Sequence, residues 1–209
     1  MQEILRTSSV SFRSFLRYPD ISIETGKATF LIGASGSGKS TLLKLFNGTQ
    51  SPDSGEVYYR GKAIASLDTV ELRREVLLVG QSVYLFPGTI QDNFRSYYAY
   101  READPPPESR ILQYLSLCCA EFPLDADCES MSGGERQRIY LAIALSLHPR
   151  ILMLDEPTSA LDEQTAGALL SNIKRFCIEE GITLIVISHD AKLTNRFADQ
   201  VIHLKRTVI

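Results

Sequence analysis

A short glycine-rich stretch contains the residues best suited to bind phosphate. Gly33–Ser40 reads GASGSGKS, with a strand-like run before it and a helix-like run after it. The glycines let the backbone curl so that successive N–H groups point inward, and the start of the helix adds partial positive charge. Lys39 can reach the β- and γ-phosphates of a nucleotide, and the Ser40 hydroxyl can ligate Mg²⁺. The pattern predicts a phosphate-binding loop, against the alternative of a flexible glycine–serine turn.

Two adjacent carboxylates follow the apolar run Ile151–Leu154. Asp155 and Glu156 stand where this run would leave a sheet, and ligands of open α/β sheets sit beyond the carboxyl ends of the strands. There Asp155 would hold Mg²⁺, usually through its water, and Glu156 would activate the attacking water as a general base. Acidic strand ends are common, so the pair points to chemistry only because the chain also carries the phosphate loop.

A second candidate anion site precedes the helical stretch Glu135–Leu147. Ser132-Gly133-Gly134 would offer a hydroxyl, exposed N–H groups and the positive end of a helix. An ordinary N-cap turn is the alternative. Glu135 is unfavourable directly against a phosphate, so we expect its side chain to face elsewhere, toward a ribose or solvent. Two such helix starts imply that the chain binds two phosphates, or that two copies sandwich one nucleotide.

An alternation of strands and helices would position these residues. Apolar, alternating or β-branched runs predict strands, and helical spacing of apolar residues predicts helices. Both patterns occur in the first and the last part of the chain. The strands are expected at Asp20–Glu24, Ala28–Ile32, Ile151–Leu154 and Thr183–Ile187, and the helices at Ser40–Phe46 and Glu163–Glu180. Such a rhythm is typical of a parallel sheet, with Ser51–Arg60 forming a turn and then an antiparallel strand.

The middle of the chain, from about Ser82 to Leu147, lacks strand patterns and predicts a mostly helical insert. Helices are expected at Glu108–Ala120 and Glu135–Leu147. An aromatic cluster precedes them, and we interpret it as packing surface rather than as a ligand cage. Its members are Phe94, Tyr97, Tyr98 and Tyr100.

Composition narrows the classes of protein that fit. The 209 residues suit one domain, or one domain with an inserted subdomain, and 44% hydrophobic against 22% charged residues is ordinary for a globular chain. The net charge of −3 argues against a general nucleic-acid binder, and no apolar run approaches the roughly 20 residues that span a bilayer. The N-terminus lacks the apolar region of a signal peptide. Four cysteines without a C-x-x-C pair predict neither disulfides nor a zinc site, and favour a reducing cytosol.

Together these motifs resemble those of an ATP-binding cassette (ABC) nucleotide-binding subunit, in the family's order and over essentially the whole chain. Gly33–Thr41 resembles the Walker A motif, Met131–Arg138 (MSGGERQR) the ABC signature, and Ile151–Pro157 (ILMLDEP) Walker B. Ser159–Asp162 is similar to the D-loop, Gln81 stands at the Q-loop position and His189 at the position of the switch histidine. Met131 and Glu135 depart from the usual leucine and glutamine of the signature.

The resemblance implies an α/β fold: a P-loop NTPase of the ABC type with a RecA-like parallel-sheet core, an antiparallel β subdomain and an inserted helical subdomain. We expect a single ABC ATPase domain over residues 1–209, with the core at 1–81 and 148–209 and the helical signature subdomain at 82–147. The implied cofactors are ATP and Mg²⁺.

The family's site residues carry over to matching positions of this chain. Glu156, His189 and Gln81 would be catalytic, and Ser40, Gln81 and Asp155 would hold the metal ion. The nucleotide would contact Gly33, Ala34, Ser35, Gly36, Ser37, Gly38, Lys39, Ser40 and Thr41, together with Ser132, Gly133, Gly134 and Asp162. Phe15 is the first candidate to stack on adenine, with Phe12 and Tyr18 next.

The resemblance also implies a head-to-tail homodimer that forms on ATP binding. Ser132-Gly133-Gly134 of one copy would face the γ-phosphate held by Lys39 of the other copy, which would explain two anion sites in a chain that holds one nucleotide. Asp162 would join the two sites across the interface.

The stretch Ser82–Phe94 (SVYLFPGTIQDNF) resembles one common in exporter-type cassettes, where a groove receives a helix of the membrane partner. Exposed Tyr84, Leu85, Phe86 and Ile90 would form an apolar docking patch, against the alternative of ordinary packing inside the insert. With the short length, this stretch resembles small stand-alone cassettes attributed to metal-ion export, including an iron exporter. The implied function is ATP-driven transport through a separate permease, on the cytoplasmic face of the cell membrane.

Two other classes of protein compete with this interpretation. ABC ATPases that act on DNA carry a long coiled coil between the Walker A and signature motifs, whereas about 90 residues without sustained heptads separate Thr41 from Met131 here. ABC ATPases that act on ribosomes usually carry two cassettes, and P-loop kinases lack the Ser132-Gly133-Gly134 motif. No nucleic-acid partner is therefore expected.

Overall fold

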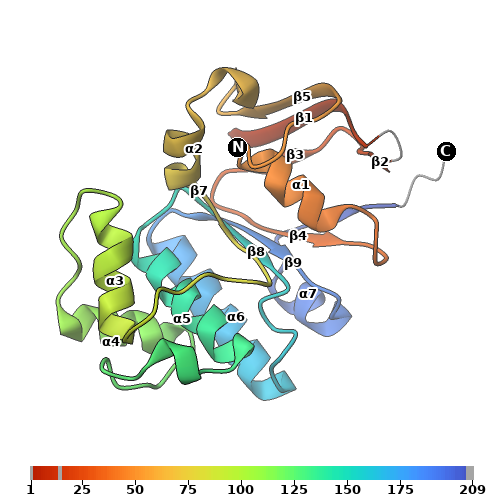
Figure 1. Cartoon of the computed structure of the whole chain (residues 1–209). Coiled ribbons are helices and arrows are strands. Elements are labelled where there is room, and N and C mark those ends of the chain that lie inside the picture. Colours follow the sequence, from red (N-terminus) through yellow and green to blue (C-terminus); the bar gives the residue numbers. More distant parts are fainter. Residues whose placement is uncertain (1, 14–15, 206–209) are drawn as a thin grey trace.

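Five parallel strands form the central sheet within residues 2–13 and 16–205, the part of the chain that the computed structural model describes (Figure 1). Their order across the sheet is β10-β4-β9-β8-β7. Three of the four strands expected from the sequence lie in this sheet, as β4 (Ala28–Ile32), β8 (Ile151–Asp155) and β9 (Thr183–Ile187). The fourth, expected at Asp20–Glu24, is a strand of the antiparallel sheet described below. Sequence reasoning missed the two edge strands, β7 (Val76–Val79) and β10 (Gln200–His203).

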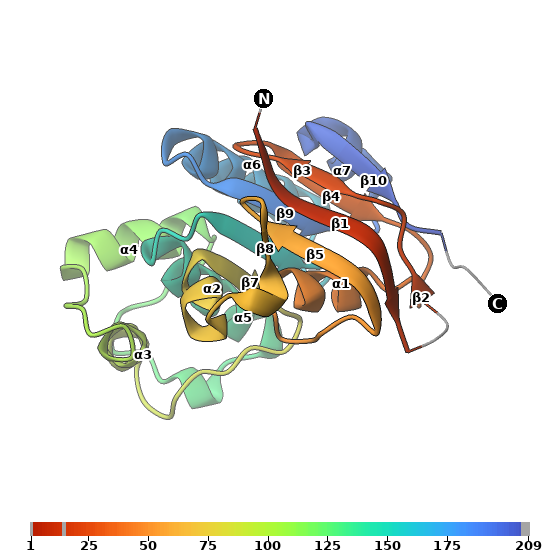
Figure 2. The ribbon, with the colours of Figure 1, turned by 90° about the horizontal axis from the view of Figure 1, so that it is seen from above.

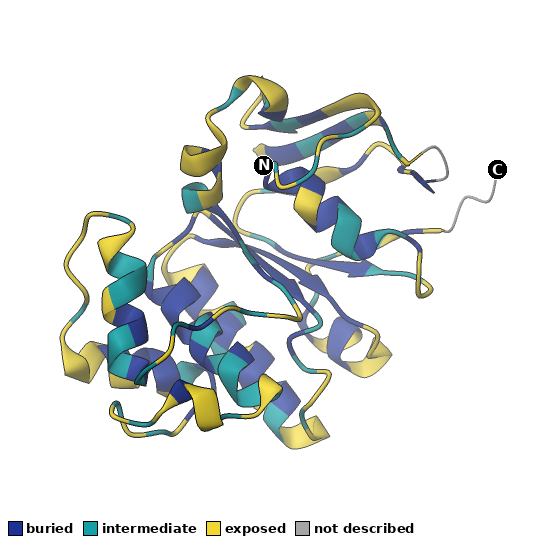
Figure 3. Ribbon diagram, in the orientation of Figure 1, coloured by how far each residue is buried: buried dark blue, intermediate teal, exposed yellow. Residues whose placement is uncertain are grey.

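Both faces of this sheet are covered, as the dark strands at the centre of Figure 3 show. Leu152 and Leu154 of β8 pack into one apolar cluster, and Ile151 and Met153 pack into a second cluster on the opposite face. A parallel strand buried on both faces reads as a continuous apolar run, which is why β8 and β9 were visible in the sequence.

An antiparallel sheet lies above the parallel one. Strand β1 (Glu3–Phe12) pairs with β2 (Leu16–Arg17), β3 (Ser22–Glu24) and β5 (Ser54–Tyr59), and β5 pairs with β6 (Lys62–Ala63). The helix α1 (Lys39–Phe46) lies between the two sheets, and Figure 2 shows β1 and β5 passing over it. Its buried face joins side chains from both sheets in one cluster, so the antiparallel sheet fixes the position of α1.

The helices of the middle region gather on one side of the parallel sheet (Figure 1). They are α3 (Ile90–Ala99), α4 (Glu108–Leu117) and α5 (Gly133–Ser146). The last two match the helical stretches expected from the sequence, whereas α3 was not assigned in advance. The remaining helical segments are η1 (Ile64–Ser66), α2 (Thr69–Glu75), η2 (Cys128–Ser130), α6 (Glu163–Glu179) and α7 (Ala191–Phe197). No helix in the described part of the chain is long and apolar enough to cross a membrane.

The helical insert shares its core with the sheet. Phe94 of α3 and Ile139 of α5 belong to the same buried cluster as Phe30 of β4 and Leu154 of β8. The apolar packing therefore runs without a break from the sheet into the insert.

The expected apolar docking patch after β7 is wrong in two of its four members. Tyr84 is 60% exposed and Phe86 is half-buried, but Leu85 is only 3% exposed and Ile90 is fully buried. Ile90 begins α3, and its side chain belongs to the buried cluster that the insert shares with the parallel sheet.

A buried asparagine shapes this loop. The Asn93 side chain accepts from the Phe86 N–H at 2.8 Å and donates to the carbonyls of Phe86 and Thr89 at 3.0 Å each. The bonds to Phe86 pair its backbone N–H and carbonyl in a loop that lies outside any strand or helix, and together the three bonds hold the loop against α3. The sequence alone gave no reason to single out Asn93.

Candidate functional site

The residues that could do chemistry meet because four neighbouring parallel strands end at the same edge. β4 leads into the phosphate loop, β8 ends at Asp155, and β9 is followed by His189. β7 leads into the loop that carries Gln81. Carboxyl ends of parallel strands always share one edge of the sheet, so the strand order alone brings these distant segments together.

The phosphate loop is built around a buried lysine. Lys39 is 6% exposed, and its Nζ donates to the carbonyls of Gly33 at 2.8 Å and Ala34 at 3.1 Å. Gly38 takes the left-handed conformation (φ 88°) that lets the chain turn into α1. Of the side chains that the structure describes, none caps the start of α1, so its first N–H groups remain available to an anion.

Burial and neighbouring charges act in opposite directions on this lysine. Burial lowers the pKa of Lys39, whereas the carboxylates of Glu156 and Asp155 raise it. A phosphate chain bound on the loop would supply the negative charge that favours the protonated amine.

Asp155 has the features of a metal ligand. The residue is 7% exposed, and among the described residues its Oδ1 finds no hydrogen-bond partner. Burial raises the pKa of Asp155, while a hydrogen bond with Ser40 lowers it. A buried carboxylate oxygen without a partner, beside a hydroxyl at the start of α1, fits the all-oxygen ligand set that Mg²⁺ prefers.

The protein alone offers few ligands for such an ion. Within the described ranges no group of three or more His, Cys, Asp or Glu residues could hold a metal. The ion would therefore depend on phosphate oxygens and water for most of its ligands, as Mg²⁺ commonly does in nucleotide sites.

Glu156 and His189 form a direct pair. The distance from His189 Nε2 to Glu156 Oε1 is 2.9 Å, and the histidine side chain is about half exposed. Glu156 has φ 53°, a conformation that is uncommon for a residue with a side chain, and its backbone N–H donates to the carbonyl of Ile187 at 3.2 Å. Strain of this kind persists where the surroundings enforce it, and it often marks a functional position.

A cavity of about 520 Å³ connects the phosphate loop with the Glu156–His189 pair, and Asp155 is not among the residues that line it. Lys39, Ser40, Gln81, Glu156 and His189 line it together with other phosphate-loop residues. Sequence reasoning missed several further lining residues, which come from loops, from the short strand β2 and from the last turn of α1: Arg13, Leu16, Lys44 and Gln50.

The three aromatic candidates for adenine stacking have different outcomes. Phe15 lies outside the described residues. Phe12 lines the cavity, so it remains a candidate. Tyr18 is unsuitable, because it is 6% exposed and its hydroxyl donates to the carbonyl of Gly38 beneath the loop.

The signature serine lies outside this cavity. Ser132 is the N-cap of α5, and no described residue between 131 and 138 lines the cavity that holds Lys39. Glu135 turns back onto this cap while staying accessible to solvent, since its Oε2 accepts from the Ser132 N–H at 2.8 Å and from the hydroxyl at 2.7 Å. These bonds lower the pKa of Glu135, so a charged carboxylate stands beside the signature.

Two further contacts place residues of the predicted site. Asp162 caps α6 by accepting from the N–H and hydroxyl of Thr165, and it does not line the cavity. Gln137 of α5 donates to the carbonyl of Gly80 at 3.2 Å, which ties the signature helix to the loop that carries Gln81.

Comparison with known sequences identifies relatives along most of the chain. The family model described as ABC transporter matches residues 16–159. The L-cystine import ATP-binding protein TcyC of Bacillus subtilis is 34% identical, over 93% of this chain and 82% of its own. The methionine import ATP-binding protein MetN 1 of Listeria monocytogenes and Protein STAR1 of Oryza sativa are each 35% identical. They match 87% and 95% of this chain, which spans only 55% and 57% of their lengths.

Solved structures agree with the fold and with the family. One is cbiO1 from Clostridium perfringens, described as part of the ABC transporter complex cbiONQ, with a TM-score of 0.84, 28% identity, and coverage of 100% of this chain and 88% of that chain. Another is a dimer of the ATP-binding cassette MJ0796 in a post-hydrolysis state with ADP and Pi, with a TM-score of 0.84, 27% identity, and coverage of 98% and 95%. The chain belongs to the ABC transporter family, and it is an ATP-binding ATPase cassette of that family.

Proposed function

We propose that the chain is the ATP-hydrolysing subunit of a transporter and that it drives solute movement through a separate permease. One observation carries the proposal: the phosphate loop and the Glu156–His189 pair line one cavity at one sheet edge. A triphosphate seated on the loop with its terminal phosphate beside that pair would be placed for attack by water.

Hydrolysis is assigned to the residues nearest the terminal phosphate. Glu156 accepts the proton of the attacking water as general base, and His189 orients the Glu156 carboxylate through their 2.9 Å contact. Lys39 neutralises phosphate charge, and Gln81 senses the occupied site through its loop.

Magnesium fits the oxygen-lined part of this site. Ser40 and Asp155 would hold the ion, with Gln81 as a further ligand. The buried, unpaired Oδ1 of Asp155 supports this assignment. When bound, Mg²⁺ offsets the charge that develops on the phosphate oxygens.

The active unit is proposed to be a homodimer. Ser132 and Gly133 are exposed at the start of α5, outside the cavity of their own chain, and a second copy could present them to the phosphates. Asp162 would lie near the interface. The dimeric cassette with ADP and Pi supports this arrangement, since its similarity covers 98% of the present chain and 95% of its own.

Mixing two inactive variants tests the dimer. Lys39→Ala removes the phosphate lysine and Ser132→Ala removes the signature hydroxyl, so each protein alone should hydrolyse little ATP. In a mixed dimer one site combines both lesions and the other is intact, so random pairing should restore about a quarter of the wild-type rate. If the mixture stays as inactive as its components, the shared site is refuted.

The permease is proposed to dock near Ser82–Phe94, on an aromatic groove rather than on the patch expected from the sequence. Phe86 packs against Tyr84, Tyr97 and Tyr100 with ring centroids 5.0, 5.4 and 5.8 Å apart. A neighbouring cavity of about 390 Å³ is lined by two of these tyrosines, by Tyr140 and by basic side chains, among other residues: Tyr97, Tyr100, Tyr140, Arg73, Arg74 and Arg101. Such a surface suits a helix that brings an apolar face and an acidic residue.

A charge placed in the groove tests this docking surface. Tyr100, which is 72% exposed, would be changed to Glu, and Ile178, which is 60% exposed on α6, would be changed to Glu as the matched control. Only Tyr100→Glu should prevent recovery of a membrane protein with the tagged cassette from solubilised membranes, while both variants keep basal ATPase activity. Equal recovery with both variants would exclude the groove.

The finer proposal is export of a metal ion from the cytoplasmic face of the membrane, and it rests on the Ser82–Phe94 stretch. The names of the cystine and methionine relatives favour import instead. Membrane vesicles with the cassette on their outer face distinguish the two directions. Uptake of the metal ion into the vesicles on addition of ATP would support export. ATP-driven release of a preloaded solute would contradict export and indicate import.

The proposed organisation divides the domain into a core at 1–81 and 148–209 and a helical subdomain at 82–147. The link from Gln137 to Gly80 would connect them near the Gln81 loop. A non-transport role on ribosomes or DNA remains the alternative function. Recovery of the tagged cassette with ribosomes or DNA, in place of a membrane protein, would favour that alternative.

A further inference from the structure

Tyr18 lies directly beneath the phosphate loop. Its backbone N–H donates to the carbonyl of Val10, and the residue is 6% exposed. Its hydroxyl donates to the carbonyl oxygen of Gly38 at 2.9 Å, and the Thr41 side chain pairs with the same hydroxyl. Tyr18 therefore joins the antiparallel sheet to the residue at which the loop becomes α1.

Gly38 fits closely onto this support. A Cβ atom at Gly38 would lie 2.6 Å from the Tyr18 hydroxyl and 3.2 Å from both methyl carbons of Leu16. Gly38 has φ 88°, and glycine rotates easily about such angles. Without an external restraint, the peptide that follows Gly38 would be the easiest part of the loop to reorient.

The hydrogen bond restrains that peptide in a direction that matters for anion binding. In a trans peptide the C=O and the next N–H point in opposite directions. The Gly38 carbonyl accepts from Tyr18 and from the Leu42 N–H at 2.8 Å, so it points along α1. The Lys39 N–H must then point the other way, toward the phosphate side of the loop.

We propose that Tyr18 is a positioning residue for ATP binding: its hydroxyl holds the Gly38 carbonyl and thereby aims the Lys39 N–H at the phosphates. The inference rests on the proposed role of the Gly33–Thr41 loop as the triphosphate site. Burial raises the pKa of Tyr18 to about 12, so the hydroxyl remains a donor at the pH of any ATPase assay.

Removing one hydroxyl tests the inference. Tyr18→Phe keeps the ring and deletes the bond to Gly38. We expect the Kd for MgATP, measured by isothermal titration calorimetry, to rise about three- to tenfold, the range for one hydrogen bond. KM for ATP should rise by a similar factor, and kcat at saturating ATP should stay within about twofold, because the hydroxyl does not touch the reacting atoms.

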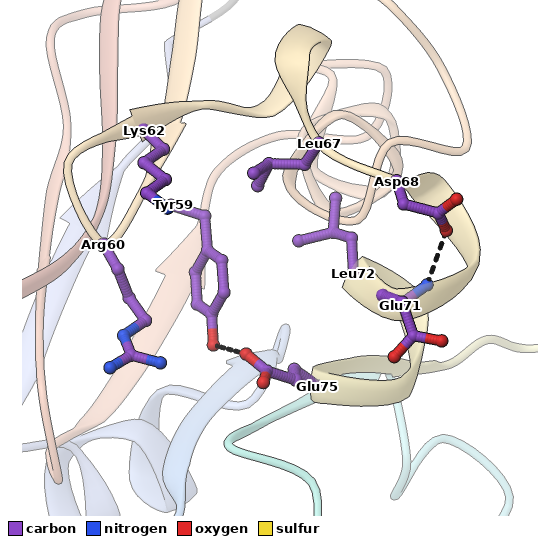
Figure 4. Close-up of a pocket in the computed structure, with 8 residues that line it drawn as sticks. All are labelled: Tyr59, Arg60, Lys62, Leu67, Asp68, Glu71, Leu72 and Glu75. Atoms are coloured by element: carbon purple, nitrogen blue, oxygen red, sulfur yellow. Dashed lines mark hydrogen bonds between the residues drawn. The ribbon is translucent and has the colours of Figure 1, made fainter.

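Tyr59→Phe is a matched control. Tyr59 is 5% exposed and its hydroxyl donates to Glu75 at 2.5 Å, on the side of the antiparallel sheet where β5 meets α2 (Figure 4). Figure 4 shows this bond beside a cavity of about 390 Å³ that is lined by no phosphate-loop residue. Both variants lose one hydrogen bond from a buried tyrosine, but only Tyr18→Phe should weaken ATP binding.

Three results are decisive. An unchanged Kd in Tyr18→Phe overturns the inference, and so does an equal rise in Tyr59→Phe, because a general loss of stability would then explain both. Lys39→Ala separates this failure from failure of the proposed function. Loss of MgATP binding in Lys39→Ala with normal binding in Tyr18→Phe rejects the Tyr18 role alone, whereas normal binding in Lys39→Ala rejects the loop as the triphosphate site.

Discussion

Replacing Glu156 by glutamine separates catalysis from binding at this site. The substitution exchanges one carboxylate oxygen for an NH₂ group of the same size, so the other oxygen can still lie 2.9 Å from His189 Nε2. The backbone N–H of Glu156 keeps its bond to the carbonyl of Ile187, and the strained φ of 53° is unchanged. The variant therefore loses the proton acceptor and keeps the shape of the site.

The expected loss follows from the role of a general base. Such a group contributes about 10²- to 10⁴-fold, so kcat for Glu156→Gln should fall by that factor. The fall corresponds to about 3–5 kcal/mol in the activation barrier. ATP affinity should be retained or slightly increased, because the charge removed lies near Lys39 and competes with phosphate for it. Trapped ATP should also stabilise the dimer.

Phosphate release at saturating ATP, calorimetric Kd values and size-exclusion chromatography with ATP measure these three quantities. Glu163→Gln is the control, because Glu163 is an exposed carboxylate on the same side that pairs with Lys192 and does not line the nucleotide cavity. Turnover of Glu156→Gln within tenfold of wild type would refute Glu156 as general base, whatever the dimer does.

Three further substitutions have expected outcomes of different sign. Because burial raises the pKa of Asp155, the ligand-free fold loses stability as pH rises from the unfolded pKa through the folded pKa of this group. Asp155→Asn should therefore raise the free energy of unfolding at neutral pH by about 1 kcal/mol, as measured by thermal melts. The same variant should abolish the Mg²⁺ dependence of ATP binding in titrations. Glu135→Gln removes the charge beside Ser132, so ATP-driven dimer formation in the Glu156→Gln background should need severalfold less protein by analytical ultracentrifugation, and an unchanged or weaker dimer would contradict this. Asn93→Ala should lower the free energy of unfolding, measured by chemical denaturation, by about 2–3 kcal/mol, because Asn93 holds the loop of the docking groove. The ATP affinity should be unchanged, because Asn93 does not line the nucleotide cavity, and a matching loss of ATP affinity would contradict this.

The parts of the fold that the sequence revealed are those in which local chemistry is decisive. β8 and β9 were visible because strands buried on both faces carry nearly continuous apolar runs. The phosphate loop was visible because its glycines and Lys39 are required at fixed spacing by the ligand. The edge strand β10 alternates between half-buried and exposed positions and gave no comparable pattern, whereas the apolar run of β7 resembles that of β8 and was overlooked. The sheet order that pairs β4 with both β9 and β10 depends on contacts between distant segments.

The sequence by itself determined which residues can bind phosphate, hold a metal ion and activate water, since those abilities belong to side-chain type and short-range spacing. Only the tertiary structure decided how they meet and what supports them. It turned Glu135 back onto Ser132, buried Ile90, and set Tyr18 beneath Gly38. Each of these outcomes depends on which groups of distant segments are left to be buried or hydrogen-bonded once the sheets and helices pack, and no local pattern records that competition.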